Sequence, residues 1–237
     1  LKEKNYYINS EGVNGYIAEK LLLSDQAQKL QKKIVSGQKI RYIDWLVPGI
    51  IAMNILFGCL MGVGFVIIRY RKNGVLKRFK ATPLHAYEFI IAQLFSRFFI
   101  VAVMAVIIFA GTNFFLHFKM EGSYLNLIII TSIAILCHIS MGLLFSTRIK
   151  NEELAGGVIN IFIFPMMFLS GIFFSLEGTP KVMQTVSKIF PITHFIEAAR
   201  KIMLDGSNLF GVINNLLIMA GITAVFLVIS ALIFKWE

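Results

Sequence analysis

Five long apolar runs, separated by polar connections, dominate the pattern of residues along this chain. They cover residues 46–68, 94–116, 124–146, 154–175 and 211–234. At about 1.5 Å per helical residue, each run is long enough to cross a hydrocarbon core of roughly 30 Å. Because backbone groups in lipid must pair within their own segment, we expect the runs to be transmembrane helices. The pattern therefore predicts an all-α integral membrane protein, a polytopic helical bundle with five spans.

The composition supports a membrane protein. The chain is 57% hydrophobic and 15% charged, with a mean hydropathy of +0.74, whereas soluble domains are about 45–50% apolar and about a quarter charged. The net charge of +10 is explained more simply by lipid headgroups and orientation signals than by nucleic acid. Cys59 and Cys137 lie in separate runs without metal-ligand spacing, so we interpret them as small core residues.

Residues 1–45 are polar and too short to hold much of a core alone. Ser24 and Asp25 are placed to cap a helix over Gln26–Val35. We interpret this segment as the end of an extracytoplasmic region, followed by a transmembrane domain over residues 46–237. The chain starts at Leu1 without a signal peptide, and we expect it to be a piece of a longer protein.

Lysine and arginine residues near the span ends predict the orientation. The loop over 69–83 is densely basic, so we expect it in the cytoplasm together with 147–153 and the C-terminus. Arg97 lies one turn inside the second run, where it can snorkel to an interface. The outer side then holds 117–123, 176–210 and the polar tail. An outer tail requires an earlier span, so six spans with both ends in the cytoplasm are expected.

The outer segment 176–210 is predicted to hold two short amphipathic helices. The first covers 181–190 and turns Val182, Val186, Ile189 and Phe190 to one face. Pro191 separates it from a second helix that ends near residue 204. The apolar face of the second comprises Ile192, Phe195, Ile196, Ala199, Ile202 and Met203. Neither helix can span a membrane, so we expect an interfacial or re-entrant hairpin.

The sequence offers no catalytic or nucleotide-binding motif. It lacks HExxH, GxSxG and a phosphate loop of the Walker type, and no span holds a pair of carboxylates. We therefore expect a protein that is not an enzyme and carries no cofactor of its own. Two alternatives stay open. One is a membrane-embedded lipid-modifying enzyme that uses Glu177, His194 and Glu197 at the outer interface; the other is a passive channel, for which no ring of charge or filter-like loop is present.

Small and polar residues gather in the first and fourth spans. Asn54, Gly58 and Gly62 lie in the first, and Asn160 and Ser170 in the fourth. Interhelical packing is one interpretation; the other is that these residues line a translocation path at a moving subunit interface. Pro165 can kink the fourth span. His138 in the third span has no second metal ligand nearby.

The basic loop contains a short helical stretch. Val75, Leu76 and Phe79 share one face, and Lys77, Arg78 and Lys80 fill the other. A helix on the lipid surface fits this pattern. A docking helix, whose apolar ridge enters a partner's groove, fits it as well.

Four segments in this order resemble the ABC-2 type permeases, the membrane subunits of ATP-binding cassette exporters. They are RYIDWLVPGIIAMN (41–54), GVLKRFKATPL (74–84), FLSGIFFSLEGTP (168–180) and FPITHFIEAARKIMLDG (190–206). The resemblance covers 41–237. It implies a multi-pass protein of the bacterial cytoplasmic membrane that dimerises, or pairs with another permease, and binds two ATPase subunits. The ATP and magnesium ion then belong to the partner subunit.

The resemblance also implies roles for particular residues. Residues 74–83 match the family's coupling helix, and the spans 46–68 and 154–175 match those that line its export path. We therefore expect ATPase docking by Gly74, Val75, Leu76, Lys77, Arg78, Phe79, Thr82 and Pro83. Asn54, Gly58, Gly62, Asn160 and Ser170 are the expected path residues. The cargo is not encoded in any motif, although the scarcity of polar path residues favours an amphipathic or apolar one.

Overall fold

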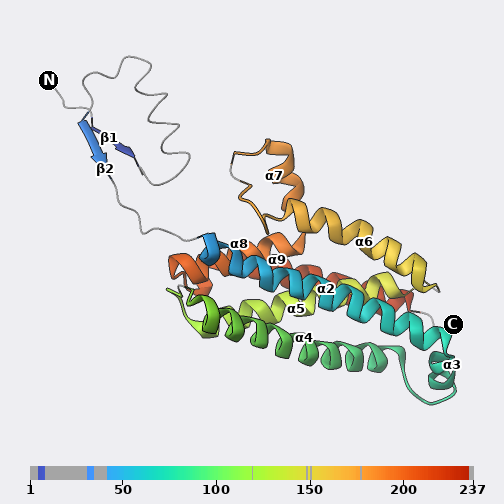
Figure 1. Cartoon of the computed structure of the whole chain (residues 1–237). Coiled ribbons are helices and arrows are strands. Elements are labelled where there is room, and N and C mark those ends of the chain that lie inside the picture. The colour runs from blue at the N-terminus through green and yellow to red at the C-terminus, as the bar shows by residue number, and fades with distance from the viewer. Residues whose placement is uncertain are drawn as a thin grey trace. The chain divides into compact units, whose positions relative to one another are not determined.

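The computed structural model divides the chain into two units, Leu1–Arg41 and Tyr42–Glu237 (Figure 1). It describes residues 5–8, 31–34, 42–118, 120–147, 149, 151–176 and 178–234.

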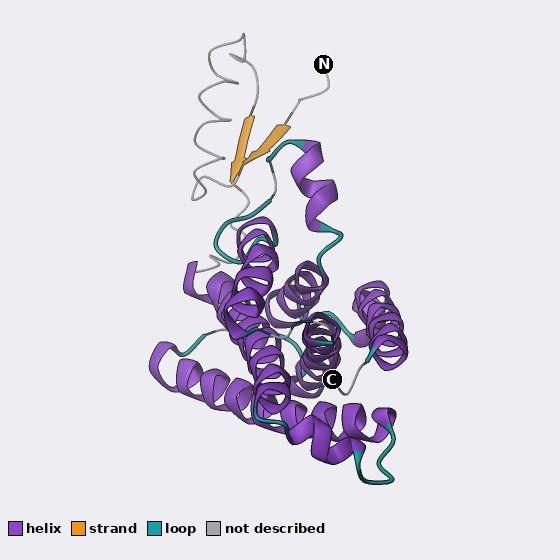
Figure 2. Cartoon of the chain, turned by 90° about the vertical axis from the view of Figure 1, so that its right-hand side faces the viewer, coloured by secondary structure: helices purple, strands orange, loops and turns teal. Residues whose placement is uncertain are grey.

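The first unit contains two short strands rather than the expected helix. Strand β1 (Asn5–Ile8) pairs in parallel with β2 (Gln31–Ile34), with Asn5 opposite Gln31 and Ile8 opposite Ile34 (Figure 2). The predicted helix over Gln26–Val35 is therefore wrong across Gln31–Ile34, and its remainder lies outside the described residues. Local capping signals favoured a helix, but this segment instead pairs as a strand with the tyrosine-containing segment Asn5–Ile8, which is distant in the sequence. The cap could not reveal that pairing.

The second unit confirms the predicted polytopic helical bundle. Five helical segments in the described part of the chain are long and apolar enough to cross a membrane. They are α2 (Tyr42–Lys72), α4 (Ala86–Leu116), α5 (Tyr124–Ser146), α6 (Glu152–Leu169), and the short 3-10 helix η1 (Leu209–Val212) continuing into α9 (Ile213–Ile233). Each corresponds to one predicted span.

The helix ends differ from the predicted spans in an informative way. Helices α2 and α4 begin or end well beyond their apolar runs, because a helix can continue past the hydrocarbon core into the headgroup layer. The fourth span was expected to reach residue 175, but α6 ends at Leu169. Gly171 follows with a φ of 77°, a left-handed conformation that favours glycine and stops a helix. Pro165 lies within α6 without ending it.

Helices α2 and α5 form the centre of the bundle. In their most apolar windows 50% of α2 and 61% of α5 is buried, against 11% for α4 and for the η1–α9 segment. The two central helices approach closely at Gly142, where an added Cβ atom would lie 2.9 Å from the Cys59 carbonyl oxygen. A side chain there would force the helices apart. The close contact between α2 and α5 thus relies on Gly142, not on the Gly58 and Gly62 pair that the sequence suggested.

Three short helices lie at the two ends of this bundle (Figure 1). Helix α3 (Val75–Lys80) follows α2 at one end, which we call the α3 end. Helices α7 (Lys181–Ser187) and α8 (Pro191–Asp205) lie at the other, which we call the hairpin end. Both predicted hairpin helices are therefore present, although α7 ends three residues earlier than expected, before Pro191.

The two hairpin helices differ in how they pack. All six residues of the predicted apolar face of α8 are buried, as the periodicity predicted. The face predicted for α7 is only partly covered: Val182 is 73% and Ile189 is 69% exposed, whereas Val186 and Phe190 are half-buried and Phe190 packs against the core. Helix α7 is too short to bring a full apolar stripe to the bundle.

Candidate functional site

Helix α3 is fixed to the bundle by its apolar face. Gly74 precedes it with a φ of 70°, a left-handed turn that redirects the chain after α2. Leu76 is fully buried. The ring of Phe79 lies 5.9 Å from that of Phe89 in α4, and Phe89 lies 5.5 Å from Phe234 after α9. Three segments of the chain therefore converge on this short helix.

The opposite face of α3 is basic and open. Lys77, Arg78 and Lys80 are all exposed. Thr82 and Pro83 are exposed where the helix ends, and the Thr82 hydroxyl donates a hydrogen bond to the Phe79 carbonyl at 2.7 Å. The predicted docking residues therefore separate into two groups. Leu76 anchors the helix and Phe79 packs on α4, so the accessible surface consists of cations and polar backbone turns.

A side chain just before α3 ties it to the next loop on the same end. The Arg71 guanidinium donates hydrogen bonds to the carbonyls of Ser146 at 3.1 Å, of Thr147 at 2.9 Å and of Ile149. These carbonyls lie at the end of α5, where helical hydrogen bonding stops and the helix dipole favours a cation. From the sequence, the start of this basic loop indicated only the orientation of the chain in the membrane. Only the fold brings Arg71 to a loop about 75 residues away.

The predicted path residues of α2 face another helix of the same chain. An added Cβ at Gly58 would lie 3.4 Å from Val101, and one at Gly62 would lie 3.8 Å from Arg97 Nη1, both in α4. The Asn54 side-chain oxygen is buried and has no hydrogen-bond partner among the described residues. This glycine stripe thus packs on α4 in the described structure, which agrees with the packing interpretation.

The predicted path residues of α6 occupy two different settings. Asn160 is half-buried. Ser170 is buried, and its hydroxyl donates to the Met166 carbonyl within its own helix. The first and fourth spans do meet, but through Gly64 against Ile159 and through Gly156 against Phe65. Two glycines other than the predicted path residues therefore pack these spans together within the chain, and the translocation path stays a prediction.

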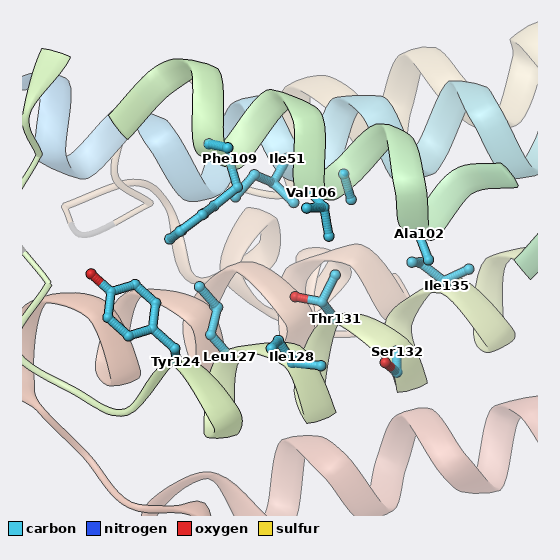
Figure 3. A pocket seen from close by; sticks show the side chains of 12 residues that line it. Ile51, Ala102, Val106, Phe109, Tyr124, Leu127, Ile128, Thr131, Ser132 and Ile135 are labelled. Atoms are coloured by element: carbon cyan, nitrogen blue, oxygen red, sulfur yellow. The ribbon is translucent and has the colours of Figure 1, made fainter. Parts of the chain in front are cut away.

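A cavity between α4 and α5 was not expected from the sequence. It measures about 220 Å³, and Ile51 of α2 forms part of its lining (Figure 3). The wall is mostly alanine, isoleucine and other apolar side chains, and its hydroxyl groups belong to Tyr124, Thr131 and Ser132. None of the five predicted path residues lines it. The lining has the character of a site for an apolar molecule with one or two hydrogen-bonding groups.

A second, more polar cavity lies at the hairpin end. It measures about 210 Å³ and is lined by Trp45, Ser170, Glu197 and Arg200 among others. The Arg200 guanidinium lies 3.6 Å from the centre of the Trp45 ring and donates to the Gly171 carbonyl at 2.8 Å. Burial lowers the pKa of Arg200 to about 10, and the nearby Glu197 carboxylate opposes that shift. The side chain therefore stays charged at neutral pH and holds the end of α6 against the start of α2.

The alternative of an enzyme at the outer interface finds no support in this geometry. A ring nitrogen of His194 lies 2.9 Å from the Lys188 carbonyl oxygen, and Asn215 donates to the Glu197 carboxylate at 3.2 Å. Both side chains thus have structural partners. Glu177, the third candidate, lies outside the described residues. No group of three or more histidine, cysteine or acidic residues within the described ranges is arranged to hold a metal ion.

Together these features define a class of protein: a polytopic helical membrane protein with an anchored basic helix at one end and an amphipathic hairpin at the other. The chain belongs to the ABC-2 type transporter family, whose pattern matches residues 13–204. It is a multi-pass protein of the bacterial inner membrane.

The chain is similar to several bacterial permeases. The chain is 25% identical over 192 residues to the probable multidrug ABC transporter permease YbhS of Escherichia coli, which is 80% of this chain and 48% of that protein. It is 25% identical to the linearmycin resistance permease protein LnrN of Bacillus subtilis, over 72% of this chain and 45% of that one. It is 24% identical to the daunorubicin resistance permease protein DrrB1 of Streptomyces coeruleorubidus, over 78% and 66%. The chain spans about half the length of YbhS and LnrN.

Proposed function

We propose that this chain is the core of a permease subunit that exports an amphipathic or apolar molecule across the inner membrane, driven by a separate ATPase subunit. The observation that carries this proposal is the construction of α3. Its apolar face is fixed to the bundle through Leu76 and Phe79, while Lys77, Arg78 and Lys80 face outward. A helix held in this way transmits a push from a bound partner to the spans instead of yielding to it.

The Arg71 hydrogen bonds extend this rigid connection between α3 and the spans. They join the α2–α3 turn to the loop after α5, so the two loops at the α3 end move as one body. Closure of the ATPase subunits on this surface then tilts α2 and α5, the central helices. We propose that paired permeases alternate in this way between inward-open and outward-open states. The contact between Arg200 and Trp45 lies at the hairpin end, where the structure has to adjust when α2 and α5 tilt.

The proposed cargo class rests on the cavity between α4 and α5 and on the relatives. The cavity is apolar with a few hydroxyl groups, which suits a molecule with a large apolar body and few polar groups. The names of YbhS, LnrN and DrrB1 refer to multidrug transport or drug resistance. We propose a cargo of the same general chemistry, without specifying the compound.

Charge reversal on the exposed face of α3 tests the docking proposal. Lys77→Glu with Arg78→Glu should abolish co-purification of the ATPase subunit and reduce transport at least tenfold, because the partner surface has to complement these cations. The matched control is Lys181→Glu with Lys188→Glu, which reverses two exposed cations at the hairpin end. Undiminished ATPase binding and transport in the α3 variant would refute docking at this face.

A further inference from the structure

Helix α4 carries a cation inside its apolar stretch. Arg97 lies between Ser96 and Phe98. About 20 residues separate it from the end of the helix at Leu116, and that length is enough to span the hydrocarbon core. Arg97 therefore lies near the boundary of the hydrocarbon core that faces the α3 end. A charge at such a depth is costly and usually has a functional partner.

Gly62 on α2 lies next to this arginine. Apart from the backbone of its own helix, an added Cβ at Gly62 would have Arg97 Nη1 at 3.8 Å as its only neighbour within 4 Å among the described residues. The guanidinium thus rests against the bare backbone of α2. One turn further along, Gly58 receives Val101 in the same manner. We call the space left by the absent side chain of Gly62 the Gly62 notch; Arg97 Nη1 borders it.

The described residues offer no acceptor to the most enclosed donor of this guanidinium. Arg97 Nε is buried within the protein and has no hydrogen-bond partner there, so only the terminal nitrogens of the side chain can meet an external group. The acidic residues of the described α2 and α4 helices are Asp44 and Glu88. Asp44 lies at the hairpin end of α2, and Glu88 accepts a hydrogen bond from the His85 backbone at 2.8 Å. A guanidinium has five donors in a planar fork, so an external group with paired acceptor oxygens fits it.

The surroundings identify the source of that group as lipid. Arg97 is half-buried, while its neighbours Phe95 and Phe99 are 66% and 71% exposed on the lipid-facing flank. The basic end of α2 begins at Arg69, about 10 Å along the helix from Gly62. The side chain of Arg97 can snorkel over part of this distance, and a lipid headgroup drawn inward covers the rest.

We propose that Arg97, seated in the Gly62 notch, binds the phosphate of an anionic phospholipid from the leaflet on the α3 side. Two parallel N–H···O bonds from the terminal nitrogens Nη1 and Nη2 to the phosphate oxygens form this contact. The bound lipid then fills the edge of the α2–α4 contact next to the anchored base of α3. This site does not depend on the identity of the cargo or on the ATPase.

Native mass spectrometry of the delipidated full transporter tests the site. Titration with phosphatidylglycerol, and with phosphatidylcholine of the same acyl chains, should show preferential retention of the anionic lipid. Arg97→Gln should reduce that preference about tenfold, the scale expected for loss of a charge-assisted hydrogen bond, and Arg97→Lys should retain part of it. The matched control, Arg69→Gln, removes an exposed cation and should leave most of the preference intact.

Two further arms separate the sources of the anion and remove the dependence on variants. Glycerol 3-phosphate at equal concentration should not compete, because it lacks the acyl chains that hold a lipid at the flank. Phosphatidylglycerol with a photoreactive headgroup should crosslink the unaltered protein near Gly62 and Arg97. Equal retention of both lipids, an unchanged preference in Arg97→Gln, full competition by glycerol 3-phosphate, or crosslinks confined to other segments would each overturn the proposal.

Discussion

Helices α3 and α8 are both short, amphipathic and placed at an end of the same bundle, yet they are held in different ways. Helix α8 buries its whole apolar face against the spans, with Phe195, Ala199 and Met203 fully enclosed. Helix α3 buries one residue fully, Leu76, and presents three cations outward. The difference teaches that α8 completes the fold, whereas α3 is attached to the fold and keeps a face for something else.

The largest expected effect lies at α8. Phe195→Ala should lower the free energy of unfolding by about 3 kcal/mol, because it removes a fully buried ring and leaves a cavity. Cys59 and Cys137 are both buried, so a thiol-reactive dye reports unfolding directly in detergent. The matched change Val182→Ala on α7, where the side chain is 73% exposed, should cost less than about 0.5 kcal/mol. Equal losses in the two variants would erase the distinction drawn for α8.

An intermediate effect is expected from the tie at the α3 end. Arg71→Met should destabilise the fold by about 2 kcal/mol, because three carbonyls lose a charged donor. Coupling should suffer more than stability, so cargo-stimulated ATPase activity in proteoliposomes should fall even at temperatures where the protein stays folded. Arg71→Lys keeps the charge without the planar fork and should show a partial defect. Normal cargo-stimulated ATPase activity in Arg71→Met would show that this side chain is not needed for coupling.

The smallest effect on stability is expected on the open face of α3. Neutralising Lys77 and Arg78 together as glutamine should change the free energy of unfolding by less than about 0.5 kcal/mol, because both side chains are exposed. The same dye assay measures this. A loss near that of Phe195→Ala would mean that α3 is integral to the fold in the way α8 is, and the comparison would fail.

Much of the bundle could be predicted because hydrophobic length is a local property. About twenty apolar residues in a row have one stable arrangement in lipid, so all five spans were located from the sequence. The buried face of α8 followed in the same way from its spacing. The face of α7 did not, since seven residues form too short a helix for periodicity to fix its packing.

The candidate site was predicted in part. The position of α3, its two faces and the basic character of one of them were present in the sequence. That Phe79 packs on the bundle, which leaves the cations as the exposed part of α3, depends on Phe89 and Phe234 from distant segments. The cavity between α4 and α5 had no sequence signal at all, because its lining residues look like any other apolar residues of a span.

By itself, the sequence determined that this protein lies in a membrane, how many times the described chain can cross it, and where a basic helix interrupts the spans. These follow from the cost of exposing polar backbone to lipid, which each segment meets alone. The tertiary structure decided which glycines carry the closest contacts, which carbonyls Arg71 reaches and which face of α3 is exposed. Those outcomes depend on the helices that surround each residue, and no single stretch of chain contains that information.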